Sequence, residues 1–112
     1  MFEQHAGRWV RSELFGGRGE VAVADLLGRR EAKPFQAVLG CELAPGGSVG
    51  VHHQTEAHEI VVCVEGRGRA TVGGETHDLV SGTMVYVALG STLALENTDA
   101  EAPLRYLIIK AK

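Results

Sequence analysis

Short apolar runs separated by glycine-rich turns repeat along this chain from about Glu20 to its C-terminal end. Apolar runs spaced about 8–12 residues apart, with turn residues between them, are typical of an all-β sandwich or barrel. No stretch has the sustained apolar period of an amphipathic helix. The sequence therefore predicts an all-β domain, and the runs that we expect to form its strands are 21–27, 35–43, 48–53, 59–64, 69–72, 75–80, 83–87, 92–96 and 104–110.

The composition agrees with a single globular domain rich in turns. The chain has 112 residues, of which 45% are hydrophobic and 22% are charged. Its 15 glycines are roughly twice the average usage for proteins. They lie between the apolar runs without a period, which indicates tight turns rather than a collagen-like or disordered chain. The pair Gly73-Gly74 predicts the clearest hairpin, because two glycines supply the positive φ angles of a two-residue turn.

The N-terminal part of the chain differs from the rest. We interpret residues 1–19 as a polar N-terminal arm and residues 20–112 as a single β-barrel domain. The segment from Gly16 to Gly19 indicates a flexible joint between the two. We expect the arm to be irregular, with Trp9 and Phe15 anchoring it either on the barrel or on a partner.

Charge and cysteine content exclude several classes of function. A formal net charge of −3 leaves no basic surface for nucleic acid. The first residues lack the apolar region of a signal peptide, and no apolar run is long enough to span a membrane. Cys41 and Cys63 lie in apolar runs, so we interpret them as reduced, buried thiols. These features favour a cytoplasmic protein with neither a nucleic-acid nor a membrane partner.

The segment between Gly46 and Gly66 is the most informative part of the sequence. Five residues separate Gly46 from His52, Gln54 follows two positions later, and Glu59 and Gly66 complete the pattern. This spacing resembles the first conserved motif of the cupin superfamily, G-x5-H-x-H-x4-E-x6-G, with glutamine in place of the second histidine. The resemblance implies a small β-barrel with a site inside it.

A second segment resembles the other cupin motif, G-x5-P-x-G-x2-H-x3-N. It aligns without gaps on Gly82, Gly90 and Asn97, with Ala88 in place of the proline and Leu93 in place of the histidine. The two motifs occur in the expected order, and the resemblance covers about residues 35–109. It implies an all-β, antiparallel double-stranded β-helix, which is the jelly-roll barrel of the cupins.

The same resemblance implies a divalent-metal site. In cupins, the histidines and the glutamate of the first motif and the histidine of the second hold the metal inside the barrel. The corresponding residues here are His52, Gln54 and Glu59, with Leu93 in the fourth place. Gln54 offers only a neutral carbonyl oxygen, and Leu93 offers no ligand atom. We therefore expect one divalent ion (Zn, Fe, Mn or Ni) to bind weakly or not at all.

Strand alternation extends this site to a pocket. Residues two apart on a strand face the same side, so His52 and Gln54 point inward together. By the same rule, Glu59 shares its face with the residues two and four positions later. The side chains that we expect to line the pocket are Val61, Cys63, Tyr86 and Leu93.

A second register of the first motif exists. Counting from Gly47 places His53 and Thr55 at the two histidine positions. Threonine is a poor ligand for divalent metals, so this register loses more ligand atoms than the first. We favour His52 as the inward histidine, with His53 and His58 facing outward.

These observations lead to three functional hypotheses. The first is a small-molecule-binding cupin with a degenerate metal site. The alternatives are a metal-dependent enzyme of the oxygenase or isomerase type that uses the same residues, and a non-catalytic accessory protein with a vestigial site. The 59–64 run is apolar on both faces, which indicates cover from a second sheet or a second subunit, and we expect a homodimer.

Overall fold

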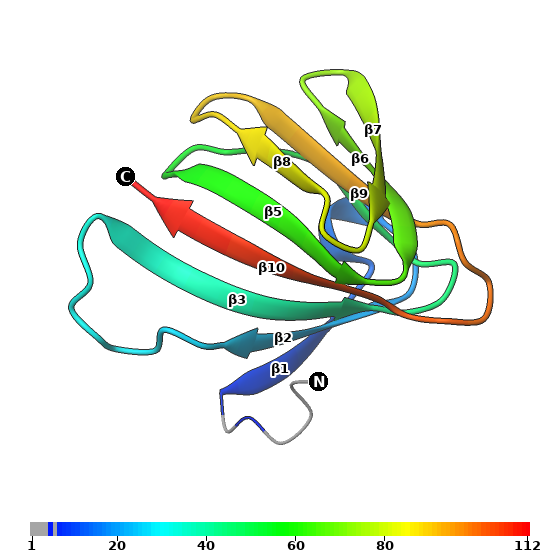
Figure 1. Cartoon of the computed structure of the whole chain (residues 1–112), viewed down its shortest axis with the longest axis horizontal. Coiled ribbons are helices and arrows are strands. Elements are labelled where there is room, and N and C mark those ends of the chain that lie inside the picture. Colours follow the sequence, from blue (N-terminus) through cyan, green and yellow to red (C-terminus); the bar gives the residue numbers. More distant parts are fainter. Residues whose placement is uncertain (1–4, 6) are drawn as a thin grey trace.

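The computed structural model describes residues 5 and 7–112. Within this part of the chain, strands and turns account for nearly all of the structure, and the one helical element is a single short 3-10 turn. Figure 1 shows the strands running as two layers. The elements are β1 (Arg8–Ser12), η1 (Leu14–Gly16), β2 (Glu20–Asp25), β3 (Phe35–Leu43), β4 (Ser48–His53), β5 (His58–Glu65), β6 (Arg67–Val72), β7 (Glu75–Val80), β8 (Met84–Val87), β9 (Thr92–Asn97) and β10 (Leu104–Ala111).

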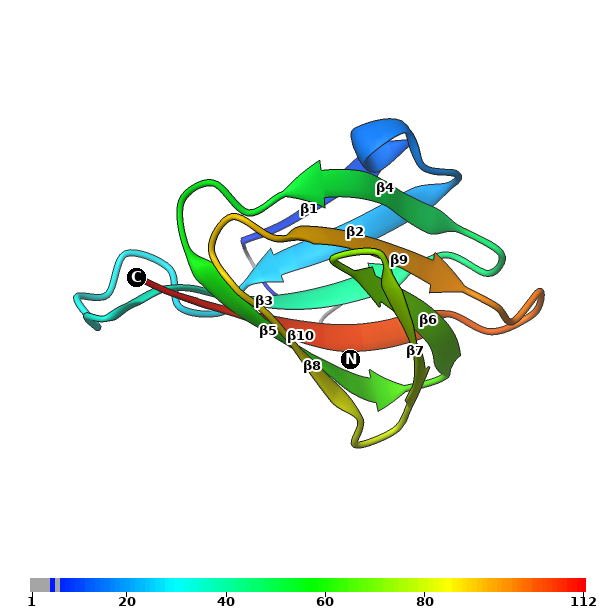
Figure 2. The same cartoon turned by 90° about the horizontal axis from the view of Figure 1, so that it is seen from above.

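The strands form two antiparallel sheets that face each other. One sheet has six strands in the order β1-β2-β3-β10-β5-β8, and the other has four in the order β4-β9-β6-β7. Seen from above, the two sheets enclose a common interior (Figure 2). The predicted antiparallel jelly-roll barrel is therefore confirmed. No helix in the described residues is long and apolar enough to cross a membrane.

The predicted strands agree closely with the observed ones. The bounds of β3, β4 and β7 are those that the apolar runs predict. The predicted hairpin joins β6 to β7, and both of its turn glycines, Gly73 and Gly74, have positive φ angles. Strand β2 ends at Asp25, two residues earlier than expected, and the Asp25 side chain accepts a hydrogen bond from the backbone N–H of Gly28 in the turn that follows.

The N-terminal arm is not irregular, which corrects our expectation. Strand β1 pairs with β2, and Trp9 lies opposite Val23 in that register. The arm therefore extends the six-stranded sheet, and Trp9 packs against the core of the same chain. The rest of the predicted arm, residues 1–4 and 6, lies outside the described residues.

The glycines that we interpreted as a flexible joint instead allow close packing. A Cβ atom added at Gly17 would collide with the carbonyl oxygen of Ser48, and one added at Gly50 would collide with that of Phe15. The backbone N–H of Arg18 also donates to the carbonyl oxygen of Ser48 over 3.1 Å. Residues 15–18 therefore lie directly on β4, and glycine is needed there because it has no side chain.

The interior is mostly apolar, and the buried amide of Asn97 joins its loops. The Asn97 side chain is 2% exposed, and its Nδ2 donates to the carbonyl oxygens of Leu43, Ala44 and Ala102. These bonds connect the turn after β3 to the turn before β10. Cys41 and Cys63 are free and buried, as predicted. The buried apolar cluster contains Val21, Val23, Cys41, Leu43, Val49, Val61, Cys63, Ala70, Leu79, Val85, Val87, Leu93, Leu95, Leu104 and Tyr106.

Candidate functional site

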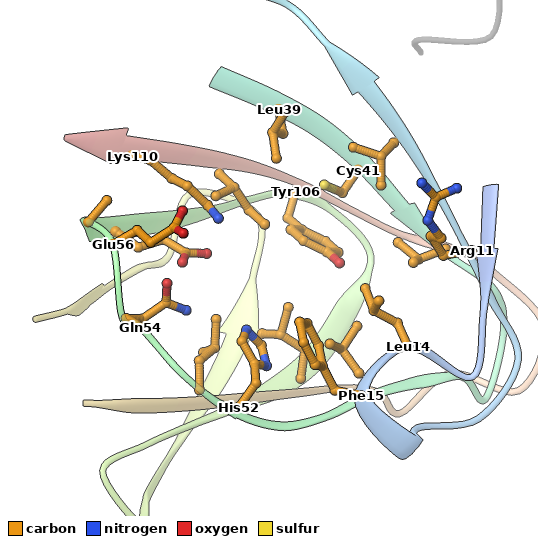
Figure 3. A pocket seen from close by; sticks show the side chains of 18 of the residues that line it. Arg11, Leu14, Phe15, Leu39, Cys41, His52, Gln54, Glu56, Tyr106 and Lys110 are labelled. Atoms are coloured by element: carbon orange, nitrogen blue, oxygen red, sulfur yellow. The ribbon is translucent and has the colours of Figure 1, made fainter. Parts of the chain in front are cut away.

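A cavity of about 410 Å³ lies between the two sheets. Its walls come from β1 to β5, β9, β10, the 3-10 turn η1 and the loop between β4 and β5. Figure 3 shows side chains from both sheets and from η1 pointing into it. A volume of this size lies within the range of roughly 300–1,000 Å³ that small-molecule sites occupy. The polar and ionisable residues that line this cavity include His52, Gln54, Glu59 and Lys110.

A β-bulge turns His52 into the cavity. The pairing of β4 with β9 shifts register between Val49 and His52, and His52 then lies opposite Leu93. Without this shift, strict alternation from the buried Val49 would bring Val51 and His53 inward. Instead, Val51 and His53 are exposed and His52 is half-buried. The bulge redirects the side chain, as bulges often do beside functional sites. His53 and Thr55, the residues of the alternative register, also line the cavity although both are exposed.

Two contacts hold the imidazole of His52. Its Nδ1 lies 2.9 Å from the carbonyl oxygen of Gly50, and its ring stacks on Phe15 with centroids 4.0 Å apart and planes 11° apart. A carbonyl oxygen only accepts hydrogen bonds, so Nδ1 carries the hydrogen and Nε2 keeps its lone pair. Burial lowers the pKa of His52; the Gly50 contact raises it, and Lys110 lowers it. The neutral imidazole is therefore favoured, with Nε2 as an acceptor.

Gln54 and Glu59 place unpaired polar atoms inside the protein. Their side chains are only 5% and 2% exposed, yet Gln54 Nε2 and Glu59 Oε2 have no hydrogen-bond partner. The backbone of Gln54 is held by bonds to Ser91 and Gly90, so the residue cannot easily swing outward. Each unpaired buried group costs about 1–3 kcal/mol. Since both residues line the cavity, a bound molecule can supply the missing partners.

Glu59 and Lys110 form a cross-strand pair at the wall of the cavity. Glu59 on β5 lies directly opposite Lys110 on β10. Burial raises the pKa of Glu59, and the positive charge of Lys110 opposes this by lowering it. The net direction is upward, so the protonated carboxyl is favoured more than in a carboxyl exposed to water.

The donor set does not fit a resident metal ion. In the described part of the chain, no three His, Cys, Asp or Glu side chains are grouped so that they could hold one. Leu93, at the fourth ligand position, is 1% exposed and apolar. Lys110 also brings a positive charge into the cavity that would hold the metal. His52 and Glu59 remain as strong donors, with Gln54 as a weak one.

The structure corrects the predicted pocket lining. Leu93 lines the cavity as expected, but Val61 and Cys63 are packed in the core and do not reach it. Tyr86 lies on the outer face of β8 and is 54% exposed, because the buried residues of that strand are Val85 and Val87. Both faces of β8 are apolar in sequence, so the alternation alone could not show which face points inward.

Tyr86 and His58 contact each other on the outer face. The Nδ1 of His58 accepts a hydrogen bond of 3.1 Å from the backbone N–H of Leu89. The Tyr86 hydroxyl lies 3.0 Å from the same nitrogen and donates to it. The prediction that His58 faces away from the cavity agrees with this arrangement.

Several lining residues escaped the sequence analysis. Lys110 and Tyr106 both point inward from β10, where they alternate with half-buried neighbours. The Tyr106 side chain is fully buried, and burial raises the pKa of both Tyr106 and Cys41, that of Cys41 to about 12. The alternation along the last apolar run could have indicated Lys110. The arm also contributes lining residues, and its docking position is not visible in any local sequence pattern. These residues are Trp9, Arg11, Leu14 and Phe15.

Comparisons with known proteins agree with this architecture. The family model described as a cupin domain matches residues 40–110. A crystal structure titled as a predicted oxalate decarboxylase from Thermotoga maritima is similar over 99% of this chain and 96% of its own, with 24% identity and a TM-score of 0.85. A comparison with curated proteins found no match.

Two further solved structures show how varied the proteins with this fold are. The match to the cupin domain of an XRE-family transcriptional regulator from Enterobacter cloacae covers 82% of this chain and 96% of that domain's chain, with 23% identity and a TM-score of 0.71. A sugar phosphate isomerase from Silicibacter pomeroyi covers 82% of this chain and 59% of its own, with 21% identity and a TM-score of 0.68. Identities this low show a shared fold and no more.

Proposed function

This chain belongs to the cupin family, and on that premise we propose that it is a small-molecule-binding protein whose ligand occupies the barrel cavity and contacts His52, Gln54 and Glu59. The observation that carries the proposal is the pair of unpaired buried atoms, Gln54 Nε2 and Glu59 Oε2, in the wall of a cavity of about 410 Å³. Buried polar atoms are rarely left unpaired in a native protein. A ligand that pairs with both atoms removes this cost.

The polar atoms are complementary to a molecule with both donors and acceptors. Gln54 Nε2 donates hydrogen bonds, and Nε2 of the neutral His52 accepts one. Glu59 Oε2 accepts when ionised and can donate when protonated. Apolar side chains such as Leu39, Leu95 and Ile108 surround these groups. Such a cavity, mostly apolar with a few convergent polar groups, is typical of small-molecule sites.

The solved structures with this fold do not indicate the ligand, which has to be inferred from the residues of the site. They include a predicted oxalate decarboxylase, a sugar phosphate isomerase and a domain of a transcriptional regulator. One fold thus hosts unrelated activities, and function has to be argued from side chains. In this chain, the missing strong ligands favour binding over metal-dependent catalysis. We propose that a divalent ion binds here only weakly.

Ligand binding can be tested with isotope-labelled protein and NMR spectroscopy. A panel of small carboxylates, amides, alcohols and sugars is added to the wild type, and the side-chain amide signal of Gln54 is followed. We expect at least one compound to shift this signal together with those of other cavity residues. His52→Ala should weaken its binding, whereas His77→Ala, on β7 outside the cavity lining, should not. Binding that maps to another surface, or no binding at millimolar concentration, would contradict the proposal.

The metal hypothesis has its own test. Calorimetric titration of the wild type with Zn²⁺, Mn²⁺, Ni²⁺ or Fe²⁺ should show weak binding only. The double variant Gln54→His and Leu93→His should bind more tightly, because two imidazoles replace a neutral oxygen donor and an apolar group. Adding His52→Ala to the double variant should remove this gain, and adding His53→Ala should not. Tight binding of a metal by the wild type would contradict the degenerate site.

A further inference from the structure

We propose that the ligand of this cavity is a small monocarboxylate with an apolar body. Lys110 makes the cavity bind this carboxylate more tightly than a neutral molecule of the same size. The inference rests on the proposed function, since it names the class of molecule that the same cavity binds. Two observations carry it: a lysine in the cavity that has no salt bridge, and a second, buried hydrogen-bond donor without a partner on another wall.

Lys110 is the first of these features. It is half-buried on β10, where the inward residues before it are Leu104, Tyr106 and Ile108. Figure 3 shows its ammonium group pointing into the cavity. Among the described residues, its ammonium group forms neither a salt bridge nor a hydrogen bond. Partial burial strengthens the field of its positive charge, so an anion in the cavity would be attracted to it.

Gln54 supplies the second donor. Its amide comes from the loop that follows β4, and Figure 3 shows Gln54 and Lys110 at the same end of the cavity, together with Glu56. The side chain is 5% exposed and its Nε2 is unpaired. A carboxylate has two oxygens that each accept hydrogen bonds, so one group can satisfy both donors. A hydrogen bond to a charged group is stronger than one between neutral groups.

The other charged groups around this position are Glu59, Glu56 and Arg11. Glu59 lies opposite Lys110, and its Oε2 has no hydrogen-bond partner. Glu56 also lines the cavity but is exposed, so water screens its charge. Arg11, on β1, adds a further positive charge to the lining.

The rest of the lining defines the body of the ligand. Trp9 and Leu14 come from the arm, and Leu39, Leu95 and Ile108 come from the two sheets. Apart from the indole N–H of Trp9, these side chains offer no hydrogen-bonding group to a second polar end. A molecule with one carboxylate and a short apolar or aromatic body therefore fits better than a dicarboxylate or a sugar.

The test uses molecules that match in size and differ in charge. Benzoate, benzamide and benzyl alcohol, and butyrate with butyramide, are titrated by calorimetry into the wild type, Lys110→Met and Lys110→Arg. We expect the carboxylates to bind about tenfold more tightly than their neutral counterparts, since a charged group strengthens each hydrogen bond. Lys110→Met should remove this preference and Lys110→Arg should retain most of it. Lys112→Met, which removes a charge from the exposed end of the chain, is the matched control.

The outcomes separate this inference from the proposed function. If the amides or alcohols bind as tightly as the carboxylates, the inference is wrong while small-molecule binding stands. The inference is also wrong if Lys110→Met weakens the binding of charged and neutral compounds equally, or if only uncharged members of the wider panel bind. If no compound of either set binds the cavity, the proposed function itself fails. Circular dichroism of each variant shows whether it has folded.

Discussion

The imidazole of His52 stacks on the ring of Phe15, with centroids 4.0 Å apart and planes inclined by 11°. The two residues lie far apart in the chain, one in η1 and the other at the bulge of β4. Phe15 adopts an unusual left-handed backbone conformation, with a φ angle of 53°. The docking of the arm, which the glycines at positions 17 and 50 permit, thus sets the position of a cavity side chain.

Replacing Phe15 should change the environment of His52. In Phe15→Ala, the imidazole loses its stacking partner and gains contact with water. Because burial is the main cause that lowers the pKa of His52, that pKa should rise toward its ordinary value. An NMR titration of the histidine ring signals measures this. Phe35→Ala removes a comparably exposed phenylalanine outside the cavity lining and should leave the titration unchanged. An unchanged His52 in Phe15→Ala would show that the arm does not shield it.

Glu59→Gln should remove a pH dependence of stability. Burial raises the pKa of Glu59 above its ordinary value of 4.5, so the folded state binds this proton more strongly than the unfolded state does. The resulting stability is fully present below about pH 4.5, and it is lost as the pH rises through the raised pKa of the folded protein. In thermal unfolding, the melting temperature of Glu59→Gln relative to that of the wild type should therefore rise from acidic to neutral pH.

The control for this comparison is Glu75→Gln, which removes a carboxyl that is exposed on β7. Its melting temperature relative to the wild type should vary less with pH than that of Glu59→Gln. A constant difference between Glu59→Gln and the wild type across the same range would mean that burial does not perturb Glu59.

Gly50→Ala should release the arm from β4. The added Cβ would collide with the carbonyl oxygen of Phe15, which is backbone and cannot move without displacing η1. We expect a loss of more than about 2 kcal/mol in the free energy of unfolding, in the upper part of the range for single substitutions. Gly82→Ala is the matched control, because its Cβ meets nothing within 4 Å and only its φ angle of 90° opposes it. Similar losses in both variants would argue against tight docking.

We also predict a homodimer that uses the outer face of β5 and β8. Ile60, Val62 and Val64 are half-buried on that face, and Met84 and Tyr86 on the neighbouring edge strand are 49% and 54% exposed. Apolar side chains gathered on an outer sheet face are typical of interfaces. Sedimentation should show a dimer at micromolar concentration, and Met84→Asp should shift it toward the monomer. A monomeric wild type would contradict this prediction.

Much of the fold could be predicted from local patterns. Alternation and turn glycines locate the strands from residue 20 onward, because side-chain period and positive φ angles are properties of short segments. The spacing of the two motifs led to His52, Gln54 and Glu59, and all three line the cavity. Tyr86 shows the limit of such patterns: with both faces of its strand apolar, only the packing of Val85 and Val87 decides which face points inward.

The sequence by itself determined the jelly-roll barrel, the inward glutamate and the absence of the usual ligands at Gln54 and Leu93. The tertiary structure decided the rest of the site. The bulge that turns His52 inward arises from the pairing of β4 with β9. Lys110 and Phe15 come from opposite ends of the chain and meet the cavity only after the sheets close and the arm docks. Periodicity reports on neighbours along one strand, whereas these contacts depend on packing between segments distant in sequence.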